Sequence, residues 1–281
     1  MFRRYKKIEL IERGGYGEVW KAHDVLTRSY VAIKFLVKDD AESYKMFQRE
    51  IRELSNLINN PHIVSITDSN LSTPAPFYVM EFCDGGSLRN QVGKTKAIEL
   101  IGILRAMAVA LKPLHQYGGF QRDIKPDNIL KMLAANGYIC KLADFGLARM
   151  PNQFSAMTRT PGGTRNYMDP EILAGKDFSP AADVYSLGIT AFELLTGTPQ
   201  RQWFLMEDCP AKLHDLMWDM TNPASSLRPT INQIEVRLAA IENERAQGFH
   251  NILSSFSYNE LALGGVGAVA LIGYLFGGDE K

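Results

Sequence analysis

Short strand-like patterns surround a single helical pattern in the first 82 residues. Apolar residues recur every three or four positions across 41–59, which is typical of an amphipathic helix. Strand patterns, built from loose alternation or short apolar runs, occupy 5–11, 20–23, 30–37, 63–67 and 77–82. This part of the chain is therefore predicted to form five strands and one helix.

Helical patterns dominate the chain after residue 82. Helices are expected over 97–117, over 179–196, from about Cys209, and over 229–245. Pro113 is expected to bend the first of them, because proline has no N–H to donate. The two patterns together predict an α+β chain, with a small strand-rich lobe over 1–82 and a larger, mainly helical lobe over 83–247.

An irregular stretch between the first two long helices concentrates chemically useful side chains. Asp123, Lys125 and Asn128 fall within six residues, and an apolar run over 138–143 then ends at Asp144. A base, a cation, an amide oxygen and a second carboxylate can together hold a hydroxyl, a phosphate and magnesium. The simpler interpretation of the Asp and Asn residues is turn chemistry.

Two features of the strand-rich lobe point to a polyphosphate. The glycine-rich stretch 12–19 lies between two strand patterns, where missing Cβ atoms let a backbone approach phosphates closely; a plain hairpin turn is the alternative. Lys34 lies inside an apolar run and needs an anionic partner unless it snorkels from an edge strand. Glu50 on the predicted helix is the better candidate partner, and Glu53 is the weaker one.

Composition narrows the possible classes of protein only slightly. The chain of 281 residues is 46% hydrophobic and 22% charged with a formal net charge of zero, which suits a globular enzyme and gives no indication of a nucleic-acid partner. The three cysteines form no C-x-x-C motif and no zinc-type spacing with histidine, so reduced thiols are expected. The N-terminus is charged and has no apolar run typical of a signal peptide.

Six motifs in order resemble those of the eukaryotic-type Ser/Thr protein kinase family. They are the glycine-rich turn, Val31-Ala32-Ile33-Lys34, Glu50, Gln121-Arg122-Asp123 with Lys125 and Asn128, Asp144-Phe145-Gly146, and Asp169-Pro170-Glu171. The resemblance covers about 5–245. It implies a bilobal protein kinase fold, ATP and magnesium as cofactors, and protein substrates; we expect a bacterial, tail-anchored member.

The resemblance also implies how ATP is bound. The expected nucleotide-binding residues are Gly14, Gly15, Tyr16, Gly17, Val19, Ala32, Lys34, Met80, Glu81, Cys83 and Leu130. The glycines and Tyr16 would cover the phosphates, and Lys34 would hold the α- and β-phosphates while pairing with Glu50. Residues 79–86 would form the hinge, in which Met80 is the gatekeeper and the backbone of Glu81 and Cys83 binds adenine.

Family roles can likewise be assigned to the irregular stretch. Asp123 would accept or orient the proton of the substrate hydroxyl, and Lys125 would neutralise the transferring γ-phosphate. Asn128 and Asp144 would bind two magnesium ions. Lysine two residues after Asp123 resembles the Ser/Thr-specific pattern rather than the tyrosine-specific one.

The resemblance also implies regulation by phosphorylation of a loop. Thr158 and Thr160 are the expected regulatory phosphosites in the loop over 155–164, with Arg122 as the receiver of the phosphate; a polar loop without a regulatory role is the alternative. Self-association would then allow autophosphorylation between molecules. Thr164 is expected to contact Asp123 and Lys125.

Two further residues are expected to support the site structurally. Asp183 would brace the catalytic loop through backbone hydrogen bonds. Arg228 would form a buried ion pair with Glu171, which is costly to break from either side.

Three departures from the family pattern support an alternative function. Glu12 replaces the first glycine of the turn, Gln121 replaces a histidine, and the connection from Thr198 to Asp208 is short. A catalytically weak pseudokinase, acting as a membrane-tethered nucleotide-binding scaffold, is therefore the alternative to an active kinase.

The C-terminal stretch lies outside the resemblance. Residues 261–278 carry no charge and follow an expected linker over 248–260. As a helix they would reach about 27 Å, just short of a hydrocarbon core of about 30 Å. We expect a single-pass anchor that holds the kinase on the cytoplasmic face of a membrane. The alternative is a cytoplasmic protein whose apolar tail packs on the kinase or on a partner.

Overall fold

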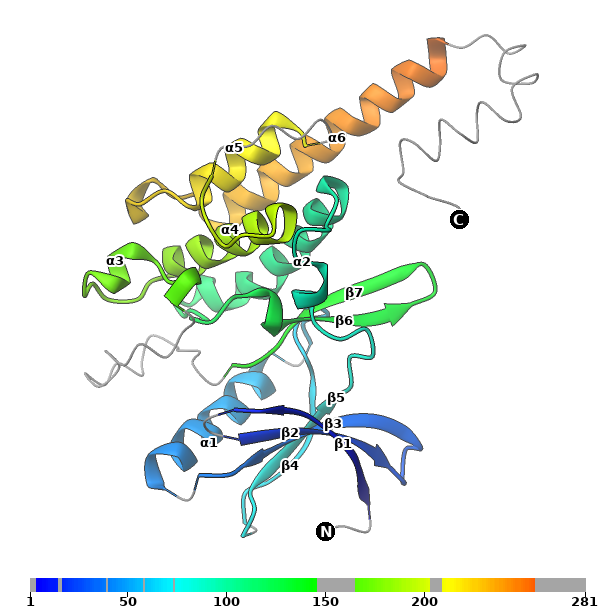
Figure 1. Ribbon diagram of the computed structural model, residues 1–281, viewed down its shortest axis with the longest axis vertical. Coiled ribbons are helices and arrows are strands. Elements are labelled where there is room, and N and C mark those ends of the chain that lie inside the picture. The colour runs from blue at the N-terminus through cyan, green and yellow to red at the C-terminus, as the bar shows by residue number, and fades with distance from the viewer. Residues whose placement is uncertain are drawn as a thin grey trace, which may run out of the picture. The chain divides into compact units, whose positions relative to one another are not determined.

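The computed structural model describes residues 4–14, 17–38, 40–57, 59–72, 74–145, 165–202 and 209–255. The chain divides into two compact units, Met1–Val236 and Arg237–Lys281. The first unit holds all the predicted site residues that are described. Figure 1 traces the sheet and the first helix of this unit in blue and cyan, and its later helices mainly in green and yellow.

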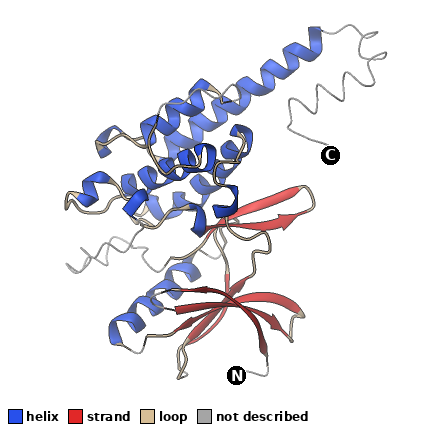
Figure 2. Cartoon of the chain, in the orientation of Figure 1, coloured by secondary structure: helices blue, strands red, loops and turns tan. Residues whose placement is uncertain are grey.

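The N-terminal lobe is an antiparallel sheet accompanied by one helix, as predicted. The strands are β1 (Tyr5–Arg13), β2 (Gly17–Asp24), β3 (Ser29–Leu36), β4 (Ile66–Asn70) and β5 (Phe77–Glu81), in the order β1-β2-β3-β5-β4. The helix is α1 (Ala41–Asn56), which begins where the Asp40 side chain accepts a hydrogen bond from the Ser43 amide at 2.8 Å. Figure 2 shows these strands in red beside that single helix.

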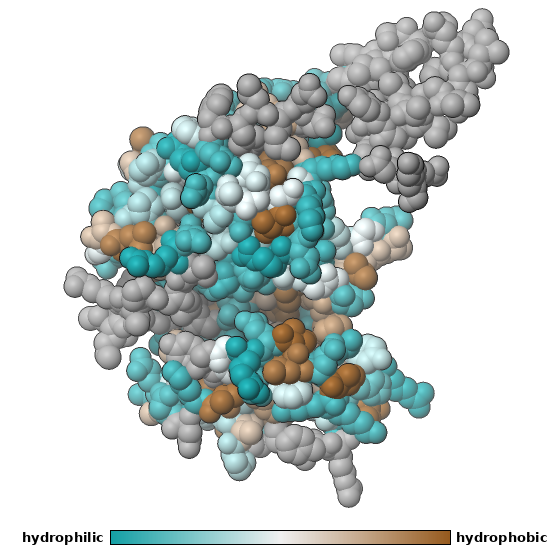
Figure 3. Space-filling model, in the orientation of Figure 1, coloured by the Kyte–Doolittle hydropathy of each residue, from teal (hydrophilic) through white to brown (hydrophobic). Residues whose placement is uncertain are grey.

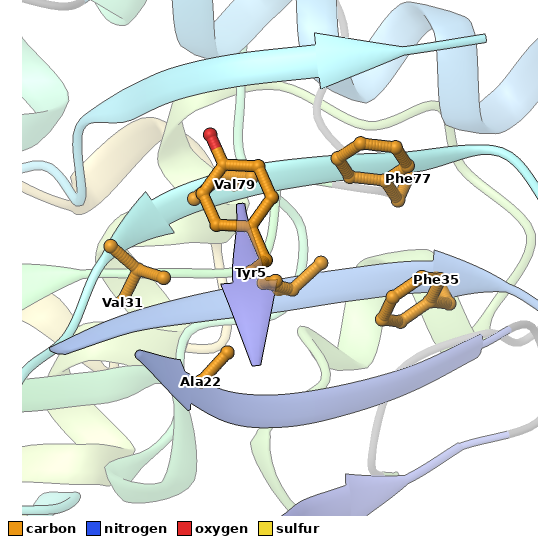
Figure 4. Close-up of a cluster of buried hydrophobic side chains, with 7 residues drawn as sticks. Tyr5, Ala22, Val31, Phe35, Phe77 and Val79 are labelled. Carbon is orange, nitrogen blue, oxygen red and sulfur yellow. The ribbon is translucent and has the colours of Figure 1, made fainter. Parts of the chain in front are cut away.

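One cluster of apolar side chains holds the sheet together (Figure 4). Its members come from four strands: Tyr5, Ala22, Val31, Ile33, Phe35, Phe77 and Val79. Val31, Ile33 and Phe35 alternate along β3, so Lys34 between them points to the opposite side of the sheet. The same alternation that builds this core therefore directs Lys34 away from it.

The strand expected over 63–67 is divided between two partners. Its second half opens β4, whereas Ile63 forms a parallel bridge with Leu142. The Val64 amide donates to the Leu142 carbonyl at 3.0 Å, and the Leu142 amide donates to the His62 carbonyl at 2.8 Å. Residues 62–64 therefore join the N-terminal lobe to the strand that leads to Asp144.

The C-terminal lobe is mainly helical and confirms the two-lobed α+β architecture. It contains α2 (Ala97–Gln116), α3 (Pro170–Leu173), α4 (Pro180–Thr196), α5 (Ala211–Met220) and the hairpin of β6 (Ile129–Ala134) with β7 (Gly137–Leu142). Helix α2 continues through Pro113. Helix α4 packs closely on the end of α5. The close approach is evident at Gly188, where an added Cβ atom would lie only 2.6 Å from Thr221 Cγ2.

The last helix differs from the expectation. Helix α6 (Ile231–Ser255) continues past the predicted end at 245, so the expected boundary at 247 falls inside it and the first part of the expected linker is helical. Within the described ranges, no helix is both long enough and apolar enough to cross a membrane. The predicted anchor over 261–278 lies outside those ranges.

The predicted ion pair between Arg228 and Glu171 is wrong. Arg228 binds the carboxylate of Asp169 instead, with Nη2 2.8 Å from Oδ1, and both side chains are almost completely buried. Glu171 pairs with Lys176 at 2.8 Å on a more exposed surface. Asp169 also caps α3 by accepting from the Glu171 amide, so this N-cap orients its carboxylate toward the interior.

Apolar side chains on the surface are scattered. The most exposed large ones include Leu26, Tyr30, Leu133 and Val236 from separate elements. On the face shown in Figure 3, hydrophobic residues form small patches among hydrophilic ones. Scattered exposure of this kind is ordinary for a soluble domain surface.

Candidate active site

Lys34 contacts its predicted partner Glu50 and also Asp144, which was expected only as a magnesium ligand. Its Nζ atom lies 2.6 Å from Glu50 Oε1 and 3.2 Å from Asp144 Oδ1. The Tyr78 hydroxyl donates to the same Glu50 oxygen at 2.9 Å. The predicted pairing of Lys34 with Glu50 is confirmed, whereas Glu53 lies 3.5 Å from Arg52.

The charge on Lys34 is maintained by its neighbours. Burial opposes the ammonium form, but the carboxylates of Asp144 and Glu50 raise the pKa of Lys34 well above its ordinary value. Burial raises the pKa of the Glu50 carboxyl, and Lys34 opposes that change. A permanently charged ammonium beside one buried and one exposed carboxylate is suited to binding an anionic ligand.

The loop over 121–128, which is the expected catalytic loop, brings Lys125 and Asn128 into direct contact with Asp123. Lys125 Nζ lies 2.8 Å from Asp123 Oδ2. The Asn128 amide nitrogen donates to the Asp123 carbonyl at 2.8 Å and to Asp123 Oδ2 at 2.9 Å. Because the amide nitrogen of Asn128 faces Asp123, its amide oxygen is the atom directed away from this contact.

Gln121 links the two acidic residues of the site through their backbones. Its Nε2 donates to the Asp144 carbonyl at 2.8 Å, and its Oε1 accepts from the Asp123 amide at 2.6 Å. The residue is completely buried. Glutamine here both donates and accepts, as expected for a replacement that orients backbone, so this departure leaves the loop braced.

Asp183 braces the same loop from helix α4, which confirms the prediction. Its two carboxylate oxygens accept from the Gln121 amide at 2.7 Å and from the Arg122 amide at 2.8 Å. His115 Nε2 lies 2.9 Å from the Gln121-bound oxygen. These bonds hold Arg122 at a φ of 80°, a left-handed conformation that is costly for a non-glycine residue. The contact of His115 could not be predicted from the sequence, because its position at the end of α2 gives no local signal.

Asn128 and Asp144 present oxygen atoms from adjacent segments. The Ala143 amide donates to the Asn128 carbonyl at 2.8 Å, which ties the loop to the end of β7. The Asp144 side chain is 48% exposed, and its backbone is left-handed with a φ of 56°. An amide oxygen and an accessible carboxylate are donors that magnesium accepts, so this pair fits the metal. The described residues contain no cluster of three or more His, Cys, Asp or Glu that could hold a metal alone.

Two glycines of the turn expected to cover the phosphates, Gly14 and Gly17, lie among the described residues. The Gly14 amide donates to the Gly17 carbonyl at 2.9 Å, and a Cβ added at Gly17 would lie 2.4 Å from the Phe35 carbonyl oxygen. Gly17 is therefore required by close packing of the turn on β3. The expected contacts at Gly15 and Tyr16 lie outside the described residues.

Several of the remaining residues expected to bind nucleotide lie on the neighbouring strands β2, β3 and β5. Val19 is directly opposite Lys34, and Ala32 is directly opposite Met80. Cys83 is buried, and burial raises the pKa of its thiol to about 12, so the thiol is unreactive at neutral pH. This agrees with the expectation that Cys83 acts through its backbone.

Arg122, the expected receiver of the phosphate, is a buried residue in this structure. The residue is 9% exposed, its guanidinium lies 4.0 Å from the centre of the Phe178 ring, and burial lowers its pKa. The predicted phosphosites Thr158 and Thr160, together with Thr164, fall outside the described residues.

A second cluster beside the catalytic loop was not predicted. Arg89 in η1 (Leu88–Gln91) has Nη1 2.6 Å from Glu193 Oε1 and Nε 3.1 Å from Asp127 Oδ1. Arg89 Nη2 also donates to the Tyr167 hydroxyl at 2.8 Å. Asp127 lies between Lys125 and Asn128 in the chain, so this cluster supports the catalytic loop from outside. The members of this cluster are separated by up to 104 residues, so no local pattern in the sequence predicts it.

Comparison with known proteins agrees with this geometry. Residues 5–237 match the model of the protein kinase domain. The chain is 39% identical over 199 residues to the serine/threonine-protein kinase KIC1 of Saccharomyces cerevisiae, a match that covers 69% of this chain and 18% of that protein. It is 34% identical over 235 residues to the serine/threonine-protein kinase Pkn1 of Myxococcus xanthus, covering 81% of this chain and 33% of Pkn1.

A third relative is similar to the chain to about the same extent. Identity to the serine/threonine-protein kinase PknB of Mycobacterium leprae is 36% over 208 residues, covering 70% of this chain and 33% of PknB. The matched part thus spans between 18% and 33% of the length of these relatives. With the family model covering most of the chain, and the fold and site described above, the chain belongs to the protein kinase domain family.

Proposed function

We propose that this protein is a Ser/Thr protein kinase that transfers the γ-phosphate of ATP to protein hydroxyls. The observation that carries the proposal is the position of Lys34, whose ammonium contacts both Glu50 and Asp144. That contact joins the proposed phosphate-binding strand to the proposed metal-binding segment. The relatives described above are named serine/threonine-protein kinases, which supports the same activity.

The residues of the chain would divide the work as follows. Lys34 would bind the α- and β-phosphates, and the turn at Gly14 and Gly17 would cover them. Asp123 would orient the substrate hydroxyl and accept its proton, while Lys125 would neutralise charge on the transferring group. Positioning matters more than basicity here, because the transition state of phosphoryl transfer is loose.

Asn128 and Asp144 would hold magnesium, which neutralises phosphate charge and orients the phosphates when it is bound. The amide nitrogen of Asn128 is occupied by Asp123, so its oxygen would be the ligand atom. The carboxylate of Asp144 would serve both the metal and Lys34. We therefore expect nucleotide binding to depend on divalent cation.

An active enzyme is favoured over the pseudokinase alternative. The replacement at Gln121 preserves hydrogen bonds to both Asp123 and Asp144. The ion pair of Lys34 with Glu50 is formed, and Asp123 is in contact with Lys125. A scaffold that only binds nucleotide has no need for the contacts of Asp123.

Transfer of radiolabelled γ-phosphate tests the proposal directly. The full chain is incubated with labelled ATP, magnesium and a general Ser/Thr protein substrate, and Asp123→Asn serves as the control. We expect labelled phosphoserine or phosphothreonine from the native chain and a loss of about 100-fold or more in the variant. Equal labelling by both proteins, or magnesium-dependent ATP binding without any transfer, would overturn the proposal.

We further propose autophosphorylation between molecules at Thr158 or Thr160. Support comes from the Ser/Thr-rich stretch over 155–164, which follows the metal-binding segment in the sequence. Mixing active chain with a size-tagged Asp123→Asn chain separates transfer between molecules from transfer within one. Phosphate mapped by mass spectrometry to these threonines of the tagged chain is the expected result.

Residues 261–278 are proposed as a single-pass anchor that leaves the kinase on the cytoplasmic face, where ATP is available. The support is an uncharged stretch of near-spanning length. Truncation after Tyr258 tests it by partition between membrane and soluble fractions. If both proteins remain soluble, the anchor proposal fails and the cytoplasmic alternative stands.

A further inference from the structure

Lys141 is a buried lysine to which the proposed mechanism assigns no role. It lies on β7, and its side chain is 9% exposed. Its Nζ atom lies 2.8 Å from Glu81 Oε1 at the end of β5. A buried ammonium is costly without an anionic partner, so this contact is a requirement of the fold at that position.

Glu81 is held at the same time by Ser65. The Ser65 amide donates to Glu81 Oε1 at 2.7 Å, and the Glu81 amide donates back to the Ser65 carbonyl at 3.0 Å. This reciprocal pair fixes both the backbone and the side chain of Glu81. We refer to Ser65, Glu81 and Lys141 together as the hinge clasp.

The hinge clasp joins the end of β5 to strand β7. These two segments are expected to lie at opposite ends of the proposed ATP site. Lys141 is directly opposite Leu130 in the β6–β7 hairpin, so the two side chains lie on the same face. Three residues after Lys141 the chain reaches Asp144. One carboxylate oxygen of Glu81 therefore connects the expected adenine-binding backbone with the β6–β7 hairpin, whose strand β6 carries the expected adenine floor and whose strand β7 leads to the expected metal ligand.

The charges of the hinge clasp reinforce this geometry. The Glu81 side chain is 21% exposed and lies next to the largely apolar hinge. Without Lys141, a partly buried carboxylate would remain with a single amide donor, and the end of β5 would be free to move toward water. Lys141 thus stabilises the orientation of Glu81 in which its side chain also accepts from the Ser65 amide.

We propose that Lys141 is a positioning residue for adenine nucleotides, acting through Glu81 on the backbone of the hinge. The inference rests on the proposed function for the identity of the ligand, an adenosine di- or triphosphate. It assigns no contact between Lys141 and the reacting phosphate. Its loss should therefore weaken nucleotide binding much more than it slows the transfer step.

The dissociation constant of ADP, measured by calorimetry on the full chain, is the primary test. Lys141→Met keeps the length of the side chain and removes its charge, and we expect the constant to rise about fivefold to tenfold. The KM for ATP should rise by a similar factor, with kcat within about twofold. Glu81→Gln retains an acceptor for the Ser65 amide, so a smaller rise is expected.

Lys131→Met is the matched control, since Lys131 lies on the neighbouring strand β6 and its removal changes net charge equally. It should leave ADP affinity unchanged. The Lys141→Met/Glu81→Gln double variant should bind ADP no worse than Lys141→Met, because both changes break one contact. If Lys141→Met does not fold, the Glu81→Gln variant and its comparison with Lys131→Met decide.

Each outcome separates this inference from the proposed function. Native affinity in folded Lys141→Met, or an equal loss in Lys131→Met, overturns the role of Lys141. A native chain that binds ADP but transfers no phosphate overturns the proposed activity alone. A native chain that binds no ADP overturns both.

Discussion

Arg228 binds the carboxylate of Asp169, and the glutamate two residues later pairs elsewhere. The guanidinium is fully buried, and it also donates to the carbonyls of Ala181, Asn222 and Pro223. Arg228 therefore links the start of α3, the start of α4 and the connection after α5. A buried pair with this many partners is a structural joint of the C-terminal lobe.

Asp169→Ala should accordingly destabilise the chain severely. Removing one partner of a buried ion pair costs about 3–5 kcal/mol, because the remaining charge stays buried. Glu171→Ala should cost much less, since its pair with Lys176 lies on a more exposed surface. Urea unfolding followed by circular dichroism gives both values. Equal costs for the two variants would contradict the assignment of Asp169 as the partner.

Gln121 is expected to be essential as a hydrogen-bonding side chain rather than as a particular residue type. Gln121→Leu leaves the Asp123 amide and the Asp144 carbonyl without their buried partner, at a cost of about 1–3 kcal/mol. We expect kcat to fall by about 10-fold to 100-fold in this variant.

Gln121→His supplies the control, because imidazole can donate to one group and accept from the other. Its kcat should stay within about threefold of the native value. Steady-state kinetics with saturating ATP measures both variants. Similar losses in the histidine and leucine variants would contradict this expectation, because they would show that a side chain able to donate and accept is not sufficient at this position.

Asp123 should impose an acid limit on activity and a pH-dependent cost on stability. Burial raises the pKa of Asp123, while Lys125 and Asn128 oppose that rise. The carboxylate must be deprotonated to accept a proton, so kcat/KM should fall as pH decreases through the raised pKa. Lys125→Met removes an opposing cation and should move this limb to higher pH.

The raised pKa of Asp123 has the opposite effect on stability: its contribution to stability decreases as pH rises, whereas activity decreases as pH falls. A carboxyl with a raised pKa binds its proton more tightly in the folded state, so its stabilising contribution is present below the unfolded pKa and is lost as pH rises through the folded pKa. Asp123→Asn removes the buried charge. Its Tm should therefore exceed that of the native chain at pH 7 and approach it at low pH, as measured by calorimetry at both pH values.

Arg89 should act on catalysis through Asp127. Arg89→Ala leaves Glu193 buried without this cation and releases Asp127 beside Lys125. We expect kcat to fall by about 10-fold with the KM for ATP nearly unchanged, since the disturbed loop bears the catalytic side chains. Arg89→Lys retains the charge without the fork and should recover activity in part. A rise in the KM for ATP without loss of kcat would place Arg89 in nucleotide binding instead.

Local patterns were sufficient for most of the fold. The apolar alternation in β3, the helical period of α1 and the turn residues around Asp123 each act over a few neighbouring positions, so they are visible in the chain itself. The same applies to the separation of a strand-rich lobe from a helical one. Pairing of Lys34 with Glu50 could be predicted because an isolated lysine in an apolar run demands an acid nearby.

Other relationships depended on contacts between distant parts of the chain. Asp169 and Glu171 are both acids near the start of α3, and only packing decided which of them faces Arg228. The split of 63–67 between β4 and β7 arose because Leu142 offers backbone partners that the sequence around Ile63 does not reveal. His115, Arg89 and Lys141 all acquire their roles from residues more than 35 positions away.

The sequence by itself determined the kinds of side chain available for phosphoryl transfer and their order along two lobes. It did so because strand, helix and loop signals are local and because the motifs keep reactive residues within short spans. Only the tertiary structure decided which acid Arg228 binds, that Gln121 bonds both acidic residues of the site, and that Lys141 reaches the hinge through Glu81. These choices are set by burial, since a charge removed from water must take whichever partner the packed chain brings within hydrogen-bond distance.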